Sequence, residues 1–230
     1  MSNLSPLQKG LSYILKSIVI ASAVIGTFLS WHAGRNSFMG GRTVFMFFTI
    51  QSNIALAVIC LAGLVKMLKN KPFSDLWYII KFVGTVSITL TGAVFCFVLA
   101  PTMQQGAWNI QNVLTHVVVP FVGILDFFVT GISSNIKKRN DLWVIVPPIL
   151  YAIYAGIGYV CNWQFAEGYN YPYFFLNWGS PAGAFGFTNE LPYMGSAWWI
   201  LALFCALLIV GMLYLLILDG LKKVFHTKNK

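Results

Sequence analysis

The chain has 230 residues, of which 58% are hydrophobic and only 9% are charged, and its formal net charge is +9. Average soluble domains carry roughly 25% charged residues, so this composition excludes an ordinary soluble protein and indicates side chains that face lipid. The positive charges lie in short segments between apolar runs, without a basic groove lined by stacking aromatics, so we expect no nucleic-acid partner.

Six apolar runs follow one another along the chain, and each is long enough to cross a bilayer, which takes about 20 residues. They cover about 11–31, 43–66, 77–100, 111–131, 142–161 and 195–218. Because lipid offers backbone groups no water, such runs must be helical. The sequence therefore predicts an all-α, polytopic integral membrane protein, with residues 1–230 forming one domain of six transmembrane helices.

Two of these runs need comment. The first is longer than the apolar core of a signal peptide and continues to about Trp31, so we predict a retained span. The fifth contains Pro147 and Pro148 near its start, where proline is tolerated because the first amides of a helix have no intrahelical acceptor.

The distribution of Lys and Arg predicts the orientation. Of the 15 such residues, all except Arg35 and Arg42 fall on one side of the predicted spans. Positive charge accumulates on the cytoplasmic side of membrane proteins. We therefore expect both termini in the cytoplasm.

The last outer loop, 162–194, is unusually long. Loops of this length are usually functional or disordered, and this one is too rich in aromatic residues for disorder. Its Trp and Tyr residues suit the membrane interface. We expect it to lie on the outer surface or to cover the helix bundle as a lid.

Polar residues inside spans are the best pointers to function in such a chain. The second span contains Thr49, Gln51, Ser52 and Asn53. Thr49, Ser52 and Asn53 have the i, i+3, i+4 spacing of one helix face, which we expect to look into the bundle. The four cysteines form no C-x-x-C pair and are expected to pack as small apolar residues, so we predict neither a metal site nor a cofactor.

The fourth span contains His116 and Asp126. Thr49 and His116 each lie about five residues below the outer end of their spans, roughly 8 Å deep, and so share a level. Histidine is the usual base for activating a hydroxyl nucleophile, and Gln51, Ser52 or Asn53 could donate hydrogen bonds to an oxyanion. Structural roles are the alternative, since Thr49 can bond its own helix and His116 can hold two helices together.

Asp126 lies roughly 15 Å along the helix from His116, too far for the third member of a catalytic triad. We expect it to pair with a lysine such as Lys81, or to bond with the polar third span, in a structural role.

Three stretches, in this order, resemble one known family: FTIQSN around Thr49, HVVVPFVGILD from His116 to Asp126, and YPYFFLN from Tyr171 to Asn177. The chain looks like the FAR-17a-like androgen-induced and androgen-dependent membrane proteins and their bacterial six-span relatives. The third stretch departs from the family pattern, with an extra aromatic residue and with Asn177 where an acid often follows.

The resemblance implies an intramembrane threonine hydrolase that cleaves fatty acid esters of hydroxy fatty acids, with Thr49 as nucleophile and His116 as base. It also implies a bacterial cytoplasmic membrane, a membrane lipid or fatty acid ester as substrate, and structural or substrate-lining roles for Tyr171, Tyr173 and Asn177. The alternative is a non-enzymatic lipid-binding protein or small-molecule carrier. The oligomeric state is not predicted.

Overall fold

The computed structural model describes residues 4–35, 41–103 and 105–227, and within these ranges the chain is helical without β-strands. Six of the described helical segments are long and apolar enough to cross a membrane, which confirms the predicted class of architecture. They are Pro6–Gly34, Phe48–Leu68, Asp75–Thr102, Ile110–Gly131, Lys138–Val160 and Ser196–Val224.

The first two spans differ at their starts from the predicted boundaries. Helix α1 (Pro6–Gly34) begins earlier than expected, because Ser5 and Gln8 form a capping box in which each side chain bonds the other's backbone amide. Helix α2 (Phe48–Leu68) begins later. The apolar run before it forms a separate short 3₁₀ helix, η1 (Arg42–Met46), and Phe47 is extended between the two.

The third and fourth spans each contain a π-helical turn. Helix α3 (Asp75–Val94) continues into the π turn η2 (Phe95–Leu99) and the 3₁₀ turn η3 (Ala100–Thr102). The fourth span consists of α4 (Ile110–Val113), the π turn η4 (Leu114–Val118) and α5 (Val119–Gly131).

The last two spans are η5 (Lys138–Ile145) with α6 (Val146–Val160), and α7 (Ser196–Thr227). The two prolines of α6 occupy its first turn, as predicted. Between α6 and α7 the outer loop is folded around the 3₁₀ turn η6 (Phe174–Leu176), and it is tied to α7 because the indoles of Trp198 and Trp199 donate to carbonyls of the loop.

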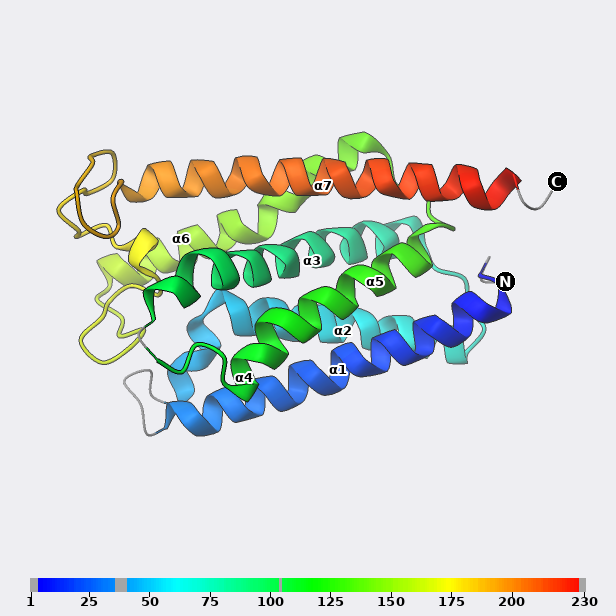
Figure 1. Cartoon of the computed structure of the whole chain (residues 1–230), viewed down its shortest axis with the longest axis horizontal. Helices are drawn as coiled ribbons and strands as arrows, with labels where there is room; N and C mark the ends of the chain where they lie inside the picture. The colour runs from blue at the N-terminus through cyan, green and yellow to red at the C-terminus, as the bar shows by residue number, and fades with distance from the viewer. Residues whose placement is uncertain (1–3, 36–40, 104, 228–230) are drawn as a thin grey trace.

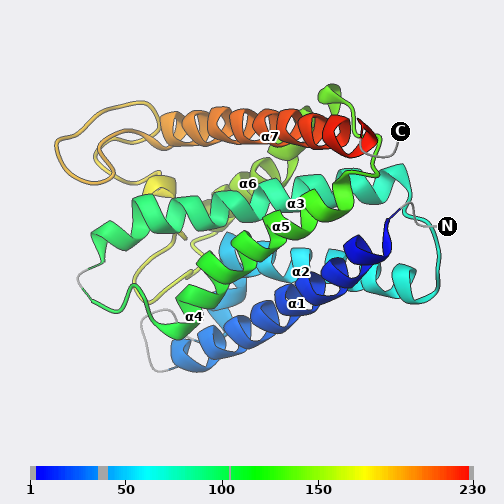
Figure 2. The same ribbon diagram turned by 45° about the vertical axis from the view of Figure 1, so that its right-hand side comes forward.

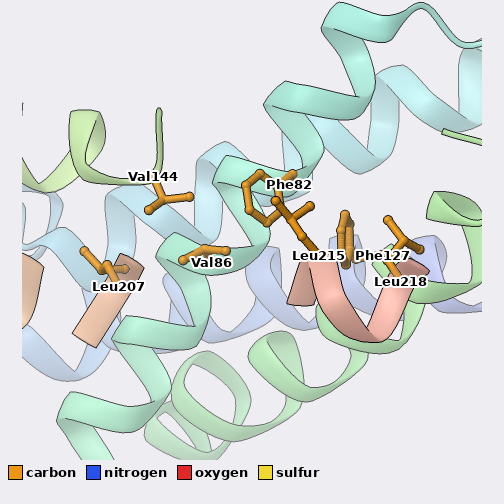
Figure 3. Close-up of a cluster of buried hydrophobic side chains, with 7 residues drawn as sticks. All are labelled: Phe82, Val86, Phe127, Val144, Leu207, Leu215 and Leu218. Carbon is orange, nitrogen blue, oxygen red and sulfur yellow. The ribbon is translucent and has the colours of Figure 1, made fainter. Parts of the chain in front are cut away.

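The helices pack in two groups. Helices α1, α2, α3 and α5 make the most extensive contacts with one another, and α7 packs against α3 and η5 (Figures 1 and 2). A buried apolar cluster attaches α7, as Figure 3 shows, with side chains of α3, α5, η5 and α7: Phe82, Val86, Phe127, Val144, Leu207, Leu215 and Leu218. The start of α1 and the end of α7 lie at one end of the bundle, and the loop 162–194 lies at the other (Figure 1).

Candidate functional site

Thr49 lies in the first turn of α2 and not, as the sequence suggested, well inside a continuous span. The first amides of a helix have no intrahelical acceptor, so they need other partners. Here the backbone N–H of Thr49 donates to the hydroxyl of Tyr173 over 3.4 Å, and the Thr49 Oγ1 atom is also 3.4 Å from that hydroxyl. The helix start therefore presents an amide and a hydroxyl to one residue of the outer loop.

The ring of Tyr173 is fixed by aromatic contacts. It stacks on Phe175 with centroids 5.0 Å apart, and it meets Phe47 edge-on at 5.7 Å. Burial raises the pKa of the Tyr173 phenol, so the group is a neutral hydroxyl at neutral pH. As a neutral hydroxyl it can accept from the Thr49 amide and still donate one hydrogen bond.

His116 is buried in the π turn η4. Its imidazole stacks on Phe95, the first residue of the other π turn, with ring centroids 3.9 Å apart. Its Nδ1 atom is 3.4 Å from the carbonyl oxygen of Thr91. Since a carbonyl can only accept, this contact favours the tautomer with the proton on Nδ1 and an unprotonated Nε2, the form that a general base requires.

The structure records no hydrogen bond between Thr49 and His116, both of which lie in its described part. They are linked only indirectly, through contacts of Ser52 and Thr91. The Ser52 Oγ atom is 2.8 Å from Thr91 Oγ1 and donates to the Thr49 carbonyl over 3.0 Å. The carbonyl of Thr91 in turn contacts the His116 ring. Thr49, in the first turn of α2, therefore contacts Tyr173 of the outer loop, whereas Ser52, one turn further along, contacts Thr91 of α3.

The other two polar residues of α2 have different surroundings. Asn53 is fully buried, and its amide donates to the carbonyl of Thr49 within α2 (2.8 Å) and to the carbonyl of Thr115 (3.1 Å), so the second of these bonds joins α2 to η4. Gln51 is exposed and donates to the carbonyl of Phe45, across the break between η1 and α2. Both of these contacts hold backbone segments in place.

A mostly apolar pocket adjoins Thr49. Its cavity volume is about 60 Å³, which is well below that of a typical small-molecule site, so a ligand of ordinary size would have to widen it. Its hydroxyl-bearing residues are Thr49, Thr91, Tyr151 and Tyr173. The remaining lining comes from α2, α3, the π turn η2, α6, α7 and the outer loop: Phe48, Leu90, Val94, Leu99, Pro148, Ala152, Phe175, Leu176, Ile200, Leu203 and Phe204.

The third motif contributes only in part to this pocket. Tyr173 lines it, but Tyr171 packs edge-on against Tyr169 within the loop, and Asn177 accepts from the amide of Gly179 and so closes a turn. The sequence assigned one structural or substrate-lining role to all three residues, because it does not reveal the path of the loop. It missed Thr91 and Tyr151 as lining residues, since their neighbours depend on how α3 and α6 are rotated.

Asp126 lies away from the pocket. Its carboxylate is 2.6 Å from the ammonium nitrogens of both Lys16 and Lys81, so the expected pairing with Lys81 is confirmed, and Lys16 is a second partner that the sequence did not reveal. Within the described ranges, no three His, Cys, Asp or Glu side chains gather as metal ligands would.

No protein-family model, curated protein or solved structure matches the chain. The relation to the FAR-17a-like membrane proteins therefore stays a prediction, carried by the three sequence stretches around Thr49, His116 and Tyr173.

Proposed function

We propose that the chain is an intramembrane hydrolase of fatty acid esters, in which Thr49 supplies the nucleophilic hydroxyl and His116 acts as general base. The observation that carries this proposal is the position of Thr49, which joins the first turn of a helix to the wall of an apolar pocket. The apolar lining would suit an acyl chain once the pocket widens to admit it, and the helix start would suit the charge that develops on an ester carbonyl under attack.

The first amides of α2, which have no intrahelical acceptor, would stabilise the tetrahedral oxyanion, because preorganised N–H donors act strongly where water is excluded. The Tyr173 hydroxyl contacts the Thr49 amide and hydroxyl, and would hold both in position. Attack by Thr49 Oγ1 breaks the ester bond and gives an acyl-threonine and a free alcohol.

His116 would take the proton from Thr49, pass it to the leaving alcohol, and then activate the water that hydrolyses the acyl-threonine. This role requires the two side chains to approach each other when substrate binds, since here the Thr49 hydroxyl contacts Tyr173 and the His116 ring contacts the Thr91 carbonyl. Catalytic hydrogen bonds are often long or absent before substrate binds.

The test uses purified protein in detergent with a panel of long-chain fatty acid esters and with a fluorophosphonate probe. We expect turnover and probe labelling in the wild type, loss of both in Thr49→Ala, and loss of turnover in His116→Ala. Thr27→Ala is the matched control, because its buried hydroxyl has no hydrogen-bond partner among the described residues and lies outside this pocket. Labelling that persists in Thr49→Ala would exclude Thr49 as the nucleophile.

A second candidate function is non-enzymatic lipid binding or transport. It is favoured by the separate partners of Thr49 and His116, which suit a headgroup contact as well as they suit a resting active site. The same preparation separates the two functions. Lipid binding that survives in Thr49→Ala, together with no turnover in the wild type, would support this candidate.

We further propose that the end carrying the loop 162–194 is extracytoplasmic, in a bacterial cytoplasmic membrane. The support is the exclusion of Lys and Arg from that side except Arg35 and Arg42. A reporter fused to the C-terminus should be active only if it is a reporter that works in the cytoplasm. Activity of a periplasmic reporter at that position would reverse the orientation.

A further inference from the structure

A second polar cluster lies in the bundle, nearer the end where α1 begins. Its core consists of Lys16 on α1, Lys81 on α3 and Asp126 on α5, and each of these side chains is fully buried. Lys16 contacts one carboxylate oxygen of Asp126 and Lys81 contacts the other, both at 2.6 Å. This cluster shares no residue with the proposed active site.

The remaining groups in contact complete the cluster. The Ser12 hydroxyl accepts from Lys16 over 2.6 Å and lies 3.2 Å from Asp126. The Cys60 sulfur on α2 is 3.3 Å from the Lys81 nitrogen and 3.9 Å from Asp126. Among the described residues, these are the titratable and charged groups that α1, α2, α3 and α5 direct at one another.

The charges of the three core groups do not balance. Two ammonium groups and one carboxylate leave one positive charge, and burying an uncompensated charge in a membrane-spanning bundle is strongly unfavourable. In the described part of the chain, Asp126 is the only carboxylate within salt-bridge distance of either lysine. The balance is restored if one lysine is a neutral amine.

Of the two lysines, Lys16 is the better suited to lose and regain a proton. Both lysines contact the carboxylate, but the neighbour of Lys16 is the Ser12 hydroxyl at 2.6 Å, which can donate to a neutral amine or accept from an ammonium. The neighbour of Lys81 is the Cys60 sulfur at 3.3 Å, which is only a weak donor and a weak acceptor. The protonated state also has support, because the Lys16 nitrogen lies 5.6 Å from the Trp77 ring and 6.0 Å from that of Phe73, near the outer limit for cation–π attraction.

The packing around Lys16 leaves little freedom. A Cβ atom added to Gly63 would come within 2.7 Å of Lys16 Cε and 2.9 Å of the Trp77 ring. The absence of a side chain at Gly63 therefore leaves the space that the Lys16 side chain occupies.

We propose that this cluster is a proton-binding site, in which Lys16 is a neutral amine that takes up one proton while Lys81 and Asp126 remain an ion pair. The proton adds to the lone pair of Lys16 Nζ and comes from water, and the Ser12 hydroxyl reverses as it binds. The occupied site carries one extra positive charge within the bundle.

The direct test is nitrogen NMR of the purified full chain with ¹⁵N-labelled lysine side chains, recorded across a pH series. Lys16→Met assigns the signal. We expect one Nζ resonance that is an amine at neutral pH and becomes an ammonium on acidification. An ammonium signal for Lys16 at every pH would overturn the proposal, and this wild-type measurement holds even where a variant fails to fold.

A thermodynamic test uses reversible unfolding at several pH values. A lysine that is neutral when folded and charged when unfolded binds its proton on unfolding, so the unfolding constant falls about tenfold per unit of rising pH over that range. Lys16→Met should lose this slope, while Lys69→Met, at an exposed position, should keep it. An unchanged slope in Lys16→Met would contradict the proposal.

Discussion

Tyr173 is the residue that connects the outer loop with the start of α2. Its hydroxyl lies 3.4 Å from both the amide nitrogen and the hydroxyl oxygen of Thr49. A contact of that length is weak in the resting arrangement, but it fixes where the Thr49 side chain points. In the proposed hydrolase, Tyr173 is thus a positioning residue.

We therefore predict that Tyr173→Phe lowers kcat of ester hydrolysis by roughly tenfold, the effect of one hydrogen bond, and leaves KM nearly unchanged. Tyr171→Phe is the matched control, because that ring packs inside the loop and does not line the pocket. Equal losses in the two variants would argue for a general effect on the loop.

The contact between Ser52 and Thr91 can be tested through stability. Each hydroxyl is buried, and removing one leaves its partner without this bond, which costs about 1–3 kcal/mol. We expect Ser52→Ala and Thr91→Val each to destabilise the protein, and the double variant to lose less than the sum. Thermal unfolding in detergent measures all three, and strict additivity would show that the two hydroxyls do not interact.

For single residues, the sequence predicted which helix face a side chain lies on but not which residues it contacts. The spacing of Ser52 and Asn53 placed both on the inner face of α2, and both are buried. The partners Thr91 and Tyr173 could not be predicted, because they depend on the rotation of α3 and on the path of a loop without regular structure.

The third and fourth spans approach each other closely near His116, where the fourth span forms the π turn η4. Pro120 has no N–H and cannot donate to the carbonyl of His116, four residues earlier, and the amide of Val119 instead donates to Leu114. Gly92 of α3 lies against the freed carbonyl, since a Cβ atom added there would be 2.8 Å from the His116 oxygen. The close crossing of α3 and η4 thus needs a glycine.

Gly92→Ala should therefore destabilise the protein by about 1–3 kcal/mol, as overpacking does, because the nearest atom belongs to the backbone. Gly10→Ala in α1 is the control, with nothing within 4 Å of the added carbon and a gain of up to about 1 kcal/mol in helix propensity. Chemical denaturation in detergent compares the two variants. A neutral Gly92→Ala would mean that α3 can move away from η4.

Hydropathy found all six spans but could not find the break before α2. The run through Phe47 stays apolar, so composition does not distinguish a continuous helix from a 3₁₀ turn followed by an extended residue. The depth assigned to Thr49 rested on that continuity, and its actual position in a first turn follows from backbone geometry alone.

Taken as a whole, the molecule ties its helices together at two separate polar centres. The Lys16, Lys81 and Asp126 cluster joins α1, α3 and α5, while the contacts of Ser52 and Asn53 join α2 to α3 and η4. The sequence predicted that Asp126 pairs with a lysine such as Lys81. It did not single out Lys16, because the sequence does not show which side chains of α1 face α5.

Removing the only anion of the core cluster should be severe. Asp126→Asn leaves two buried lysines without their carboxylate, and we expect a loss of about 3–5 kcal/mol. Replacing all three groups by apolar ones, as in Lys16→Met with Lys81→Met and Asp126→Leu, should recover most of that loss, since no unpaired charge remains. Unfolding measurements on both variants decide the matter, and a stable Asp126→Asn would show that the carboxylate is dispensable.

The pocket beside Thr49 is bounded by α2 and α3 on one side and by α6 and α7 on the other, with η6 above it. It therefore lies between these two pairs of helices, and spreading α6 and α7 from α3 would open it sideways to the hydrocarbon. A ligand arriving along that route would slide in tail first from the surrounding leaflet and never pass through water. Partitioning into the bilayer would then govern how readily a molecule is captured.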